Sequence, residues 1–168
     1  HGNARLVSAR EVEVELEGGQ QERFLSEKII LAPGSEELRL STPGLDLPGI
    51  LTSREALSLD HLPASMAVIG GGVIAVEMAS IFASFGCSVT IVQRSHILRR
   101  EDREMVRRLI PYLRRQGISL MQESTLLRVK AVDQGYSLDV KTSRGKENLA
   151  VKAVLLAVGR KPRLNGLG

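Results

Sequence analysis

Residues 66–77 read Met-Ala-Val-Ile-Gly-Gly-Gly-Val-Ile-Ala-Val-Glu, and this stretch decides the fold class. An apolar run typical of a buried strand leads directly into three glycines, and a helix pattern follows them. Gly70 allows a tight reversal, Gly72 lets backbone N–H groups approach phosphate oxygens, and small Ala75 lets the helix pack close to its strand. Because the amino end of a helix attracts anions, the stretch predicts a site for a dinucleotide pyrophosphate.

The residues that follow complete a strand-helix-strand unit of about 30 residues. Residues 73–85 are mostly apolar or small, Gly86 stands where helices usually end, and residues 88–93 form a β-branched strand pattern. A glycine motif alone is weak evidence, and a unit of this kind that binds nothing is the alternative. We favour nucleotide binding because the strand and the helix that the motif requires are both present.

The end of the second predicted strand bears on the choice between NAD and NADP. Nicotinamide-binding units usually place Asp or Glu there to accept hydrogen bonds from the adenosine ribose, whereas this chain has Gln93 followed by Arg94. A neutral amide does not repel a 2′-phosphate, and a guanidinium can pair with one. Arg94 is equally well interpreted as a solvated surface residue. The sequence therefore predicts NAD or NADP without deciding between them.

Composition limits the possible classes of protein. The 168 residues are 43% hydrophobic and 25% charged, as in an ordinary globular protein, and they suffice for one domain plus part of another. No apolar run approaches the roughly 20 residues of a membrane helix, so we expect no membrane partner and a cytoplasmic location. The chain starts with His, and a strand pattern begins almost at once, which indicates a fragment of a longer protein. The single cysteine, Cys87, excludes an internal disulfide and is expected to be a buried small residue.

Arginines gather in one stretch of the chain, residues 94–115. A basic stripe could face nucleic acid, but the helix pattern of residues 102–116 has acids in its first turn and arginines in its last. With few aromatic residues for bases to stack on, we expect no nucleic-acid partner. Pro111 is expected to kink or divide this helix. Its apolar side is predicted to consist of Met105, Leu109, Tyr112 and Leu113.

The chain reads differently before and after about Pro48. Residues 11–17 alternate between charged and apolar side chains, Gly18-Gly19 offers a turn, and residues 24–31 supply a second strand. Repeated Pro and Gly residues then indicate a linker and a domain boundary between residues 48 and 49. Further strands are predicted at residues 118–121, 126–132, 136–141, 148–151 and 154–158. The last of these is a buried parallel strand, and Gly159 after it is either a ligand contact or a plain turn.

The predicted fold class is α/β. Residues 49–168 are expected to form a Rossmann-like NAD(P)-binding domain, in which a parallel sheet carries helices and an added antiparallel meander. Residues 1–48 are expected to form a separate small antiparallel piece.

Three motifs in the same order resemble the pyridine nucleotide-disulfide oxidoreductases, a flavoenzyme family that includes dihydrolipoamide dehydrogenase, glutathione reductase and mercuric reductase. Residues 29–35, Ile-Ile-Leu-Ala-Pro-Gly-Ser, resemble the flavin-domain strand and its turn. Residues 68–77 resemble the nicotinamide fingerprint, and residues 154–162 resemble the segment that returns toward the flavin domain. Residues 165–168 continue in the style of dihydrolipoamide dehydrogenase. The resemblance covers essentially the whole chain.

The resemblance implies an FAD-dependent parent enzyme that passes a hydride between nicotinamide and FAD and exchanges electrons with a dithiol or disulfide. It makes residues 1–48 the C-terminal part of the FAD-binding domain with a linker, and it implies a homodimeric parent. The nucleotide would be held by a set of residues with separate roles: Gly70, Gly71, Gly72, Val73 and Ile74 at the pyrophosphate, Gln93 at the ribose, Leu126 at the adenine, Glu77 near the carboxamide, and Ala157, Val158, Gly159 and Arg160 at the nicotinamide half.

Several parts of the family pattern are absent from this sequence. The flavin fingerprint, the redox cysteine pair and the interface domain with its acid-base His are missing, and neither His61 nor His96 replaces that His. We therefore expect no catalytic residue, no metal site and no activity in the fragment alone. Dihydrolipoamide dehydrogenases mostly carry Glu at the position of Gln93, whereas phosphate-preferring reductases carry arginines near the positions of Arg94 and Arg100. An NADPH-dependent glutathione or mercuric reductase-like parent, or a non-catalytic nucleotide-binding module, remains the alternative.

Overall fold

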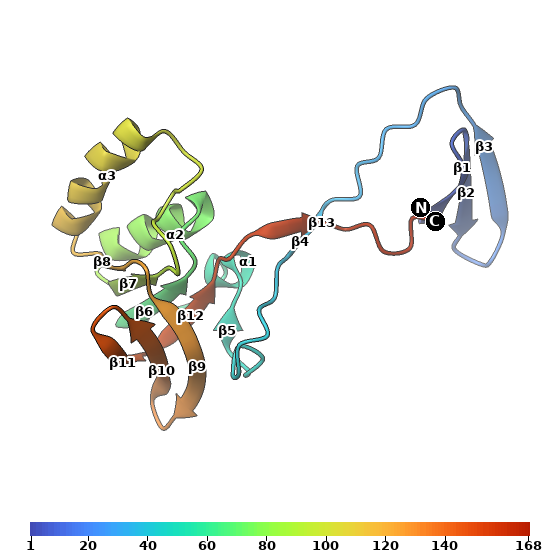
Figure 1. Ribbon diagram of the computed structural model, residues 1–168. Coiled ribbons are helices and arrows are strands. Elements are labelled where there is room, and N and C mark those ends of the chain that lie inside the picture. The colour runs from blue at the N-terminus through green and yellow to red at the C-terminus, as the bar shows by residue number, and fades with distance from the viewer. The chain divides into compact units, whose positions relative to one another are not determined.

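The structure, a computed structural model, describes residues 1–168 and consists of two compact units (Figure 1). One unit is formed by residues 37–159, and the other by residues 1–36 with residues 160–168. The two units divide between residues 36 and 37 and again between residues 159 and 160, whereas the expected domain boundary lies between residues 48 and 49. The last residues join the N-terminal unit because the strands β4 (Ser35–Glu37) and β13 (Arg160–Pro162) pair with each other.

A five-stranded parallel sheet forms the centre of residues 37–159. The strand order is β5-β12-β6-β7-β8, and every neighbouring pair is parallel. The chain leaves β6 toward β7 on one side and later returns as β12 on the other side, so β6 lies where the strand order reverses. The bounds of these strands are β5 (Ile50–Leu51), β6 (Ser65–Ile69), β7 (Ser88–Val92), β8 (Ser119–Met121) and β12 (Ala153–Leu156).

The helix α2 (Val73–Ser84) connects β6 to β7 and ends as its sequence predicts. Its C-cap is Phe85, and Gly86 follows with a positive φ of 98°, a conformation that glycine adopts without strain. The short helix α1 (Ser53–Ala56) begins with a capping box, in which the side chains of Thr52 and Glu55 each accept a backbone N–H.

The helix α3 (Arg103–Arg115) agrees with the predicted range but not with its predicted details. Asp102 is the N-cap and accepts hydrogen bonds from two backbone N–H groups. The helix continues through Pro111, because an exposed proline removes only one intrahelical bond. Of the two expected effects of Pro111, division is therefore wrong and the kink stays a prediction. The predicted apolar side is also partly wrong: Met105 is 67% exposed and Tyr112 is 50% exposed, while Leu113 is buried.

Three strands after α3 form an antiparallel meander with the order β11-β10-β9. They are β9 (Thr125–Val132), β10 (Gly135–Thr142) and β11 (Gly145–Val151), joined by tight turns. Gly135 and Gly145 have positive φ angles at these turns. The expected meander is therefore present.

Alternating side chains of the parallel strands build two separate hydrophobic cores. In β6, Met66 and Val68 pack with residues of α2 and α3, whereas Ala67 and Ile69 pack with the meander. In β12, Leu155 belongs to the first core and Val154 to the second. Because successive side chains of a strand point to opposite faces, this pattern yields three layers, with helices on one face of the sheet and the meander on the other (Figure 1). The predicted fold class is confirmed.

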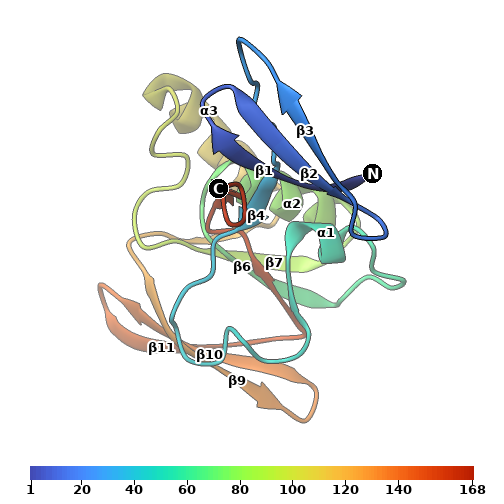
Figure 2. The same cartoon turned by 90° about the vertical axis from the view of Figure 1, so that its right-hand side faces the viewer.

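The N-terminal unit contains an antiparallel sheet in which β2 (Glu11–Leu16) lies between β1 (Gly2–Ser8) and β3 (Gln21–Leu25), as Figure 2 shows. The register places Arg5 opposite Glu13 and Glu13 opposite Arg23. Both arginines donate to the Glu13 carboxylate, which is only 3% exposed. The hydrogen bond from Arg5 is the main cause that holds the pKa of Glu13 below its ordinary value.

The strand expected over residues 24–31 is wrong from residue 26 onward. β3 ends at Leu25, and residues 29–31 have no regular structure. Ile30 is 93% exposed and Leu31 is 50% exposed. An apolar segment becomes a strand only when a neighbouring strand pairs with its backbone, and no strand pairs with residues 29–31.

Candidate functional site

The glycine turn lies at the carboxyl end of β6, the central strand of the parallel sheet. Gly70 has a φ of 118° and donates its N–H to the carbonyl of Val92, at 3.0 Å. A Cβ on Gly70 would collide with the carbonyl oxygen of Ala157. Glycine is therefore required at this position twice, for the backbone conformation and for the close passage of the chain that leaves β12.

The next two glycines face different surroundings. A Cβ on Gly71 would lie 2.8 Å from Cγ of Gln93, so the absent side chain makes room for the glutamine. Gly72 is the N-cap of α2 in an extended conformation, and a Cβ there would meet nothing within 4 Å. No side chain caps this helix, and its first turn contains no acidic residue. The amino end of α2 is therefore open to an anion.

The chain that leaves β12 runs beside the glycine turn. Ala157 donates its N–H to the carbonyl of Ile69, at 2.8 Å. Ala157 and Val158 are half-buried, and Gly159 is exposed with a φ of 125°. Residues 70 and 157 thus lie together at one sheet edge, as the sequence predicts for residues that follow neighbouring parallel strands. Arg160 belongs to the other unit, where its guanidinium donates to the hydroxyl and carbonyl oxygens of Ser35.

The loop after β7 lies against the same turn. Gln93 is half-buried, and its Nε2 donates to Oγ of Ser95 at 3.0 Å and to the carbonyl of His96 at 3.5 Å. The other side-chain atom of the amide, Oε1, is thus left to accept a hydrogen bond from a ligand. Arg94 is exposed. The predicted ribose residue therefore lies next to the predicted pyrophosphate turn.

The remaining predicted residues lie in α2 and in the core between the sheet and the meander. Val73 and Ile74 occupy the first turn of α2, and Glu77 is exposed one turn later. Leu126 is only 8% exposed and packs in the core between the sheet and the meander. Cys87 is buried, and burial raises the pKa of its thiol.

Sequence reasoning missed two residues that shape this region. Leu98 has a φ of 50° and donates its N–H to the carbonyl of Gly71, at 2.6 Å. Gln122 accepts the N–H of Ile97 on its side chain, at 2.9 Å. Nothing in the local pattern signals either contact, because each joins residues more than 20 positions apart.

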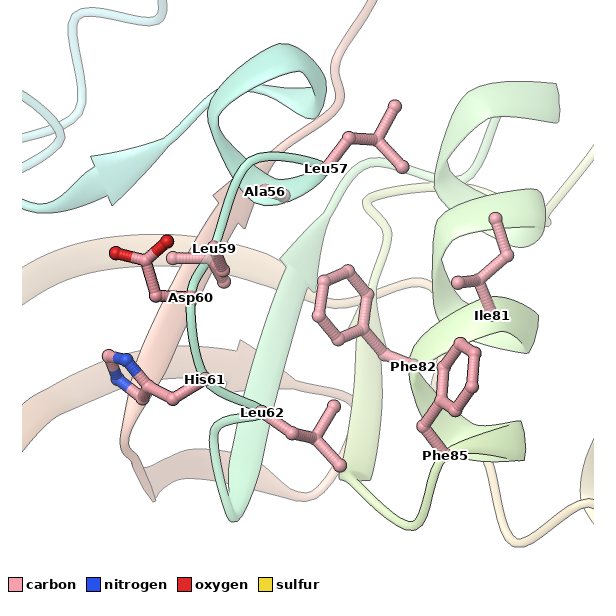
Figure 3. Close-up of a pocket in the computed structure, with 9 residues that line it drawn as sticks. All are labelled: Ala56, Leu57, Leu59, Asp60, His61, Leu62, Ile81, Phe82 and Phe85. Carbon is pink, nitrogen blue, oxygen red and sulfur yellow. The ribbon is translucent and has the colours of Figure 1, made fainter.

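A second concave surface lies at the opposite end of α2 (Figure 3). It is lined mainly by apolar side chains from α1, from the loop of residues 57–62 and from the last part of α2, namely Leu57, Leu62, Ile81, Phe82 and Phe85 together with Asp60 and His61. Since Gly72 caps one end of α2 and Phe85 the other, this groove is separate from the glycine turn.

No group of three or more His, Cys, Asp and Glu side chains is arranged to hold a metal ion. No helix has the length and apolar character that crossing a membrane requires.

The fold and the turn together define the class of protein. A glycine turn between a strand and an uncapped helix, at the point where the order of a parallel sheet reverses, is the arrangement of dinucleotide-binding proteins. A family model described as pyridine nucleotide-disulphide oxidoreductase matches residues 1–167. The chain belongs to the pyridine nucleotide-disulphide oxidoreductase family, as its motifs predict.

Curated relatives agree with this membership. The chain is 37% identical over 169 residues to a dihydrolipoyl dehydrogenase of Bacillus subtilis, covering 99% of the chain and 36% of the relative. It is 30% identical over 168 residues to a mercuric reductase of Streptomyces lividans, covering 100% of the chain and 35% of the relative. The chain thus spans about a third of the length of the relatives that it matches.

Solved structures show the same fold. The HOCl-induced flavoprotein disulfide reductase RclA from Escherichia coli superposes with a TM-score of 0.80 at 30% identity, covering 99% of the chain and 37% of the reductase. LpdA from Mycobacterium tuberculosis superposes with a TM-score of 0.84 at 24% identity, covering 99% of the chain and 37% of LpdA. At that identity the second comparison speaks for the fold alone.

Proposed function

We propose that this chain is the NAD(P)-binding portion of an FAD-dependent disulfide oxidoreductase of the dihydrolipoamide dehydrogenase type. One observation carries the proposal: the uncapped amino end of α2 opens at the reversal point of the parallel sheet, beside Gly70 and Gly72. Residues 49–168 form the nucleotide-binding domain in this proposal. Residues 1–48 form the C-terminal part of the FAD-binding domain and a linker.

The pyrophosphate is bound by the backbone N–H groups that open α2. Gly70 forms the turn, and residues 71–74 supply these donors, because the N–H of Gly70 already donates to the carbonyl of Val92. The absence of a Cβ on Gly72 leaves space for phosphate oxygens. The adenine half extends over Gln93 toward Leu126, and the nicotinamide half lies toward residues 157–160 and Glu77. Both halves start from the turn, since Gln93 and Ala157 approach it from opposite neighbouring strands.

The chain binds and orients the nucleotide but contains no group for the redox chemistry. FAD, when bound in the parent protein, accepts or donates the hydride of the nicotinamide. Electron exchange with a disulfide requires a cysteine pair, and this chain has only Cys87, which is buried. We expect the isolated chain to purify colourless and to show no thiol-dependent turnover of NADH. The parent is proposed to be a cytoplasmic homodimer.

The choice between NAD and NADP follows from the ribose end of the site. Gln93 removes the carboxylate that would repel a 2′-phosphate, and the exposed Arg94 offers a guanidinium one residue away. A charge-assisted hydrogen bond contributes about 1.5–3 kcal/mol, and exposure to solvent reduces this gain. We propose that NADP(H) is tolerated far better than in a Glu-bearing relative, while NAD(H) still binds through the amide of Gln93.

Calorimetric titration of the chain with NAD(H) and NADP(H), at two salt concentrations, tests the proposal. Both nucleotides should bind, and the affinity for NADP(H) should fall more steeply as salt rises. The matched variant Gln93→Glu should weaken NADP(H) binding and preserve NAD(H) binding. A preference of the unmodified chain for NAD(H) above about a hundredfold, ~2.7 kcal/mol, would refute the role of Arg94. Binding of neither nucleotide would refute the proposed function itself.

Two other functions are compatible with the same fold. The match to a mercuric reductase favours an NADPH-dependent reductase as the next candidate, and a non-catalytic nucleotide-binding module is the third. The full-length sequence distinguishes them: a C-x-x-x-x-C pair upstream of this segment supports an enzyme, and its absence supports the module. Activity of the full-length protein with lipoamide, glutathione disulfide and Hg(II) then identifies the substrate.

A further inference from the structure

We propose that Gln122 is a positioning residue for the ribose end of the nucleotide site. In this role it holds the loop of residues 93–98 in the shape that presents Gln93 and Arg94 to the 2′ position of the adenosine. The inference rests on the proposed function and adds to it a residue outside the glycine motif and outside the loop itself.

The side chain of Gln122 is the link between the end of β8 and this loop. Its Oε1 accepts the N–H of Ile97 at 2.9 Å, across 25 positions of sequence. Ile97 is only 1% exposed and packs in the core beneath α2. A buried N–H cannot donate a hydrogen bond to water. The amide oxygen of Gln122 therefore accepts from a donor that would otherwise be unpaired.

Gln122 is itself held in place by its neighbours. Oγ of the buried Ser124 donates to the backbone carbonyl of Gln122 at 2.8 Å. The N–H of Glu123 donates to the carbonyl of Ser95 at 3.2 Å, and the N–H of Ser124 donates to the carbonyl of Gln93 at 2.9 Å. The segment of residues 122–124 therefore runs alongside the loop and fixes it at three points.

The far end of the loop is joined to the glycine turn. Leu98 adopts a left-handed backbone with a φ of 50°, an uncommon conformation for a non-glycine residue, and donates its N–H to Gly71. Strained conformations of this kind persist where the surroundings fix them. Because Ile97 directly precedes Leu98, the contact with Gln122 is one of those that hold the loop against the turn.

A change at Gln122 is therefore expected to affect the affinity for the adenosine half of the nucleotide and not that for the nicotinamide half. Loss of the Gln122 acceptor removes one of the contacts that hold the loop and loosens it, so that Gln93 and Arg94 are less ordered before the nucleotide binds, which lowers affinity. The nicotinamide half approaches residues 157–159, which follow β12 on the opposite side of β6 from β7 and β8. The role of Gln122 is therefore specific to the adenosine end.

Calorimetry with ligands for each half of the site tests this role. The variants are Gln122→Ala and Gln122→Met, the latter close in shape to glutamine but without the acceptor. Each should lower the affinity for adenosine 2′,5′-bisphosphate about tenfold and leave that for nicotinamide mononucleotide unchanged. Gln134→Ala is the matched control, since Gln134, in the turn between β9 and β10, accepts a hydrogen bond from Lys152. It should change neither affinity.

Hydrogen exchange of the Ile97 amide in the free chain gives a second readout. Exchange should be faster in Gln122→Met and return to the original rate in Gln122→Glu, whose carboxylate accepts the same N–H. Equal loss of affinity for both half-ligands, or unchanged affinity and unchanged exchange, overturns the role of Gln122 while the proposed function stands. If the unmodified chain binds neither NAD(H) nor NADP(H), the proposed function fails and this role fails with it.

Discussion

Residues 37–159 and the N-terminal unit both form sheets, but they bury their side chains to very different extents. Every buried apolar side chain of the molecule lies within residues 37–159. In the N-terminal unit the only buried residue is Glu13, and apolar side chains such as Leu25 and Ile30 are 82% and 93% exposed. A strand thus requires a neighbouring strand to pair with, whereas a hydrophobic core also requires a second layer over the sheet.

The difference has a physical cause in the layers. The parallel sheet of residues 37–159 is covered on one face by helices and on the other by the meander, so both sets of alternating side chains are buried. The sheet of β1, β2 and β3 has no covering layer within its own unit. One face of this sheet carries a charged cluster, in which Arg5 and Arg23 pair with the buried Glu13, and no hydrophobic core.

The largest expected effect comes from adding one methyl group to the glycine turn. Gly70→Ala should destabilise residues 37–159 by more than about 3 kcal/mol, because left-handed strain alone costs about 1–3 kcal/mol and the Cβ also meets the carbonyl of Ala157. Urea unfolding followed by circular dichroism measures this change.

The matched control is Gly18→Ala in the turn between β2 and β3. Gly18 also has a positive φ, 104°, but a Cβ there meets nothing within 4 Å. This variant should leave the unfolding of residues 37–159 unchanged. Equal destabilisation by both variants would show that the two units unfold as one. It would also show that the contact with Ala157 adds nothing to the loss in the free energy of unfolding.

The next largest difference between the two units is expected in the loss of stability when a large apolar side chain is removed. Leu155→Ala deletes a fully buried side chain of β12 and should lower the free energy of unfolding by about 2–5 kcal/mol. Leu25→Ala, at an 82% exposed position, should change it by less than about 0.5 kcal/mol. A loss at Leu25 as large as that at Leu155 would reveal a core in the N-terminal unit that the structure does not contain.

The smallest expected effect is a loss of stability of the N-terminal sheet at low pH. Arginine hydrogen bonds hold the pKa of Glu13 below its ordinary value of 4.5, so its stabilising contribution is complete above pH 4.5 and is lost as the pH falls through the lowered pKa. Protection of the β1–β3 amides against hydrogen exchange should decline over that range. In Glu13→Gln the protection should be lower at neutral pH and the decline absent, and a decline that persists would assign it to another carboxylate.

Much of the fold of residues 37–159 could be predicted from sequence because its signals are local. The apolar run before Gly70, the glycine after α2 and the cap at Asp102 each lie within a few positions of the element that they begin or end. The same kind of signal was available for α1, where Thr52 and Glu55 form a capping box that the sequence analysis did not use.

Features that depend on distant partners could not be predicted. Residues 29–31 have a strand composition but no neighbour to pair with, and Tyr112 lies on a helix face that nothing covers. The contact of Gln122 with Ile97 joins two loops that become adjacent only when β7 and β8 pair. A propensity describes a segment alone, whereas these outcomes depend on what lies beside the segment.

The central claim, that the nucleotide binds at the glycine turn of residues 37–159, is tested most directly by two-dimensional amide NMR of the chain during titration with NADP. We expect saturable shifts concentrated at residues 70–77, 93–98 and 157–159, with the amides of β1–β3 unchanged. Shifts confined to the N-terminal unit or to the apolar groove beside Phe85, or no shifts at all, would contradict the claim.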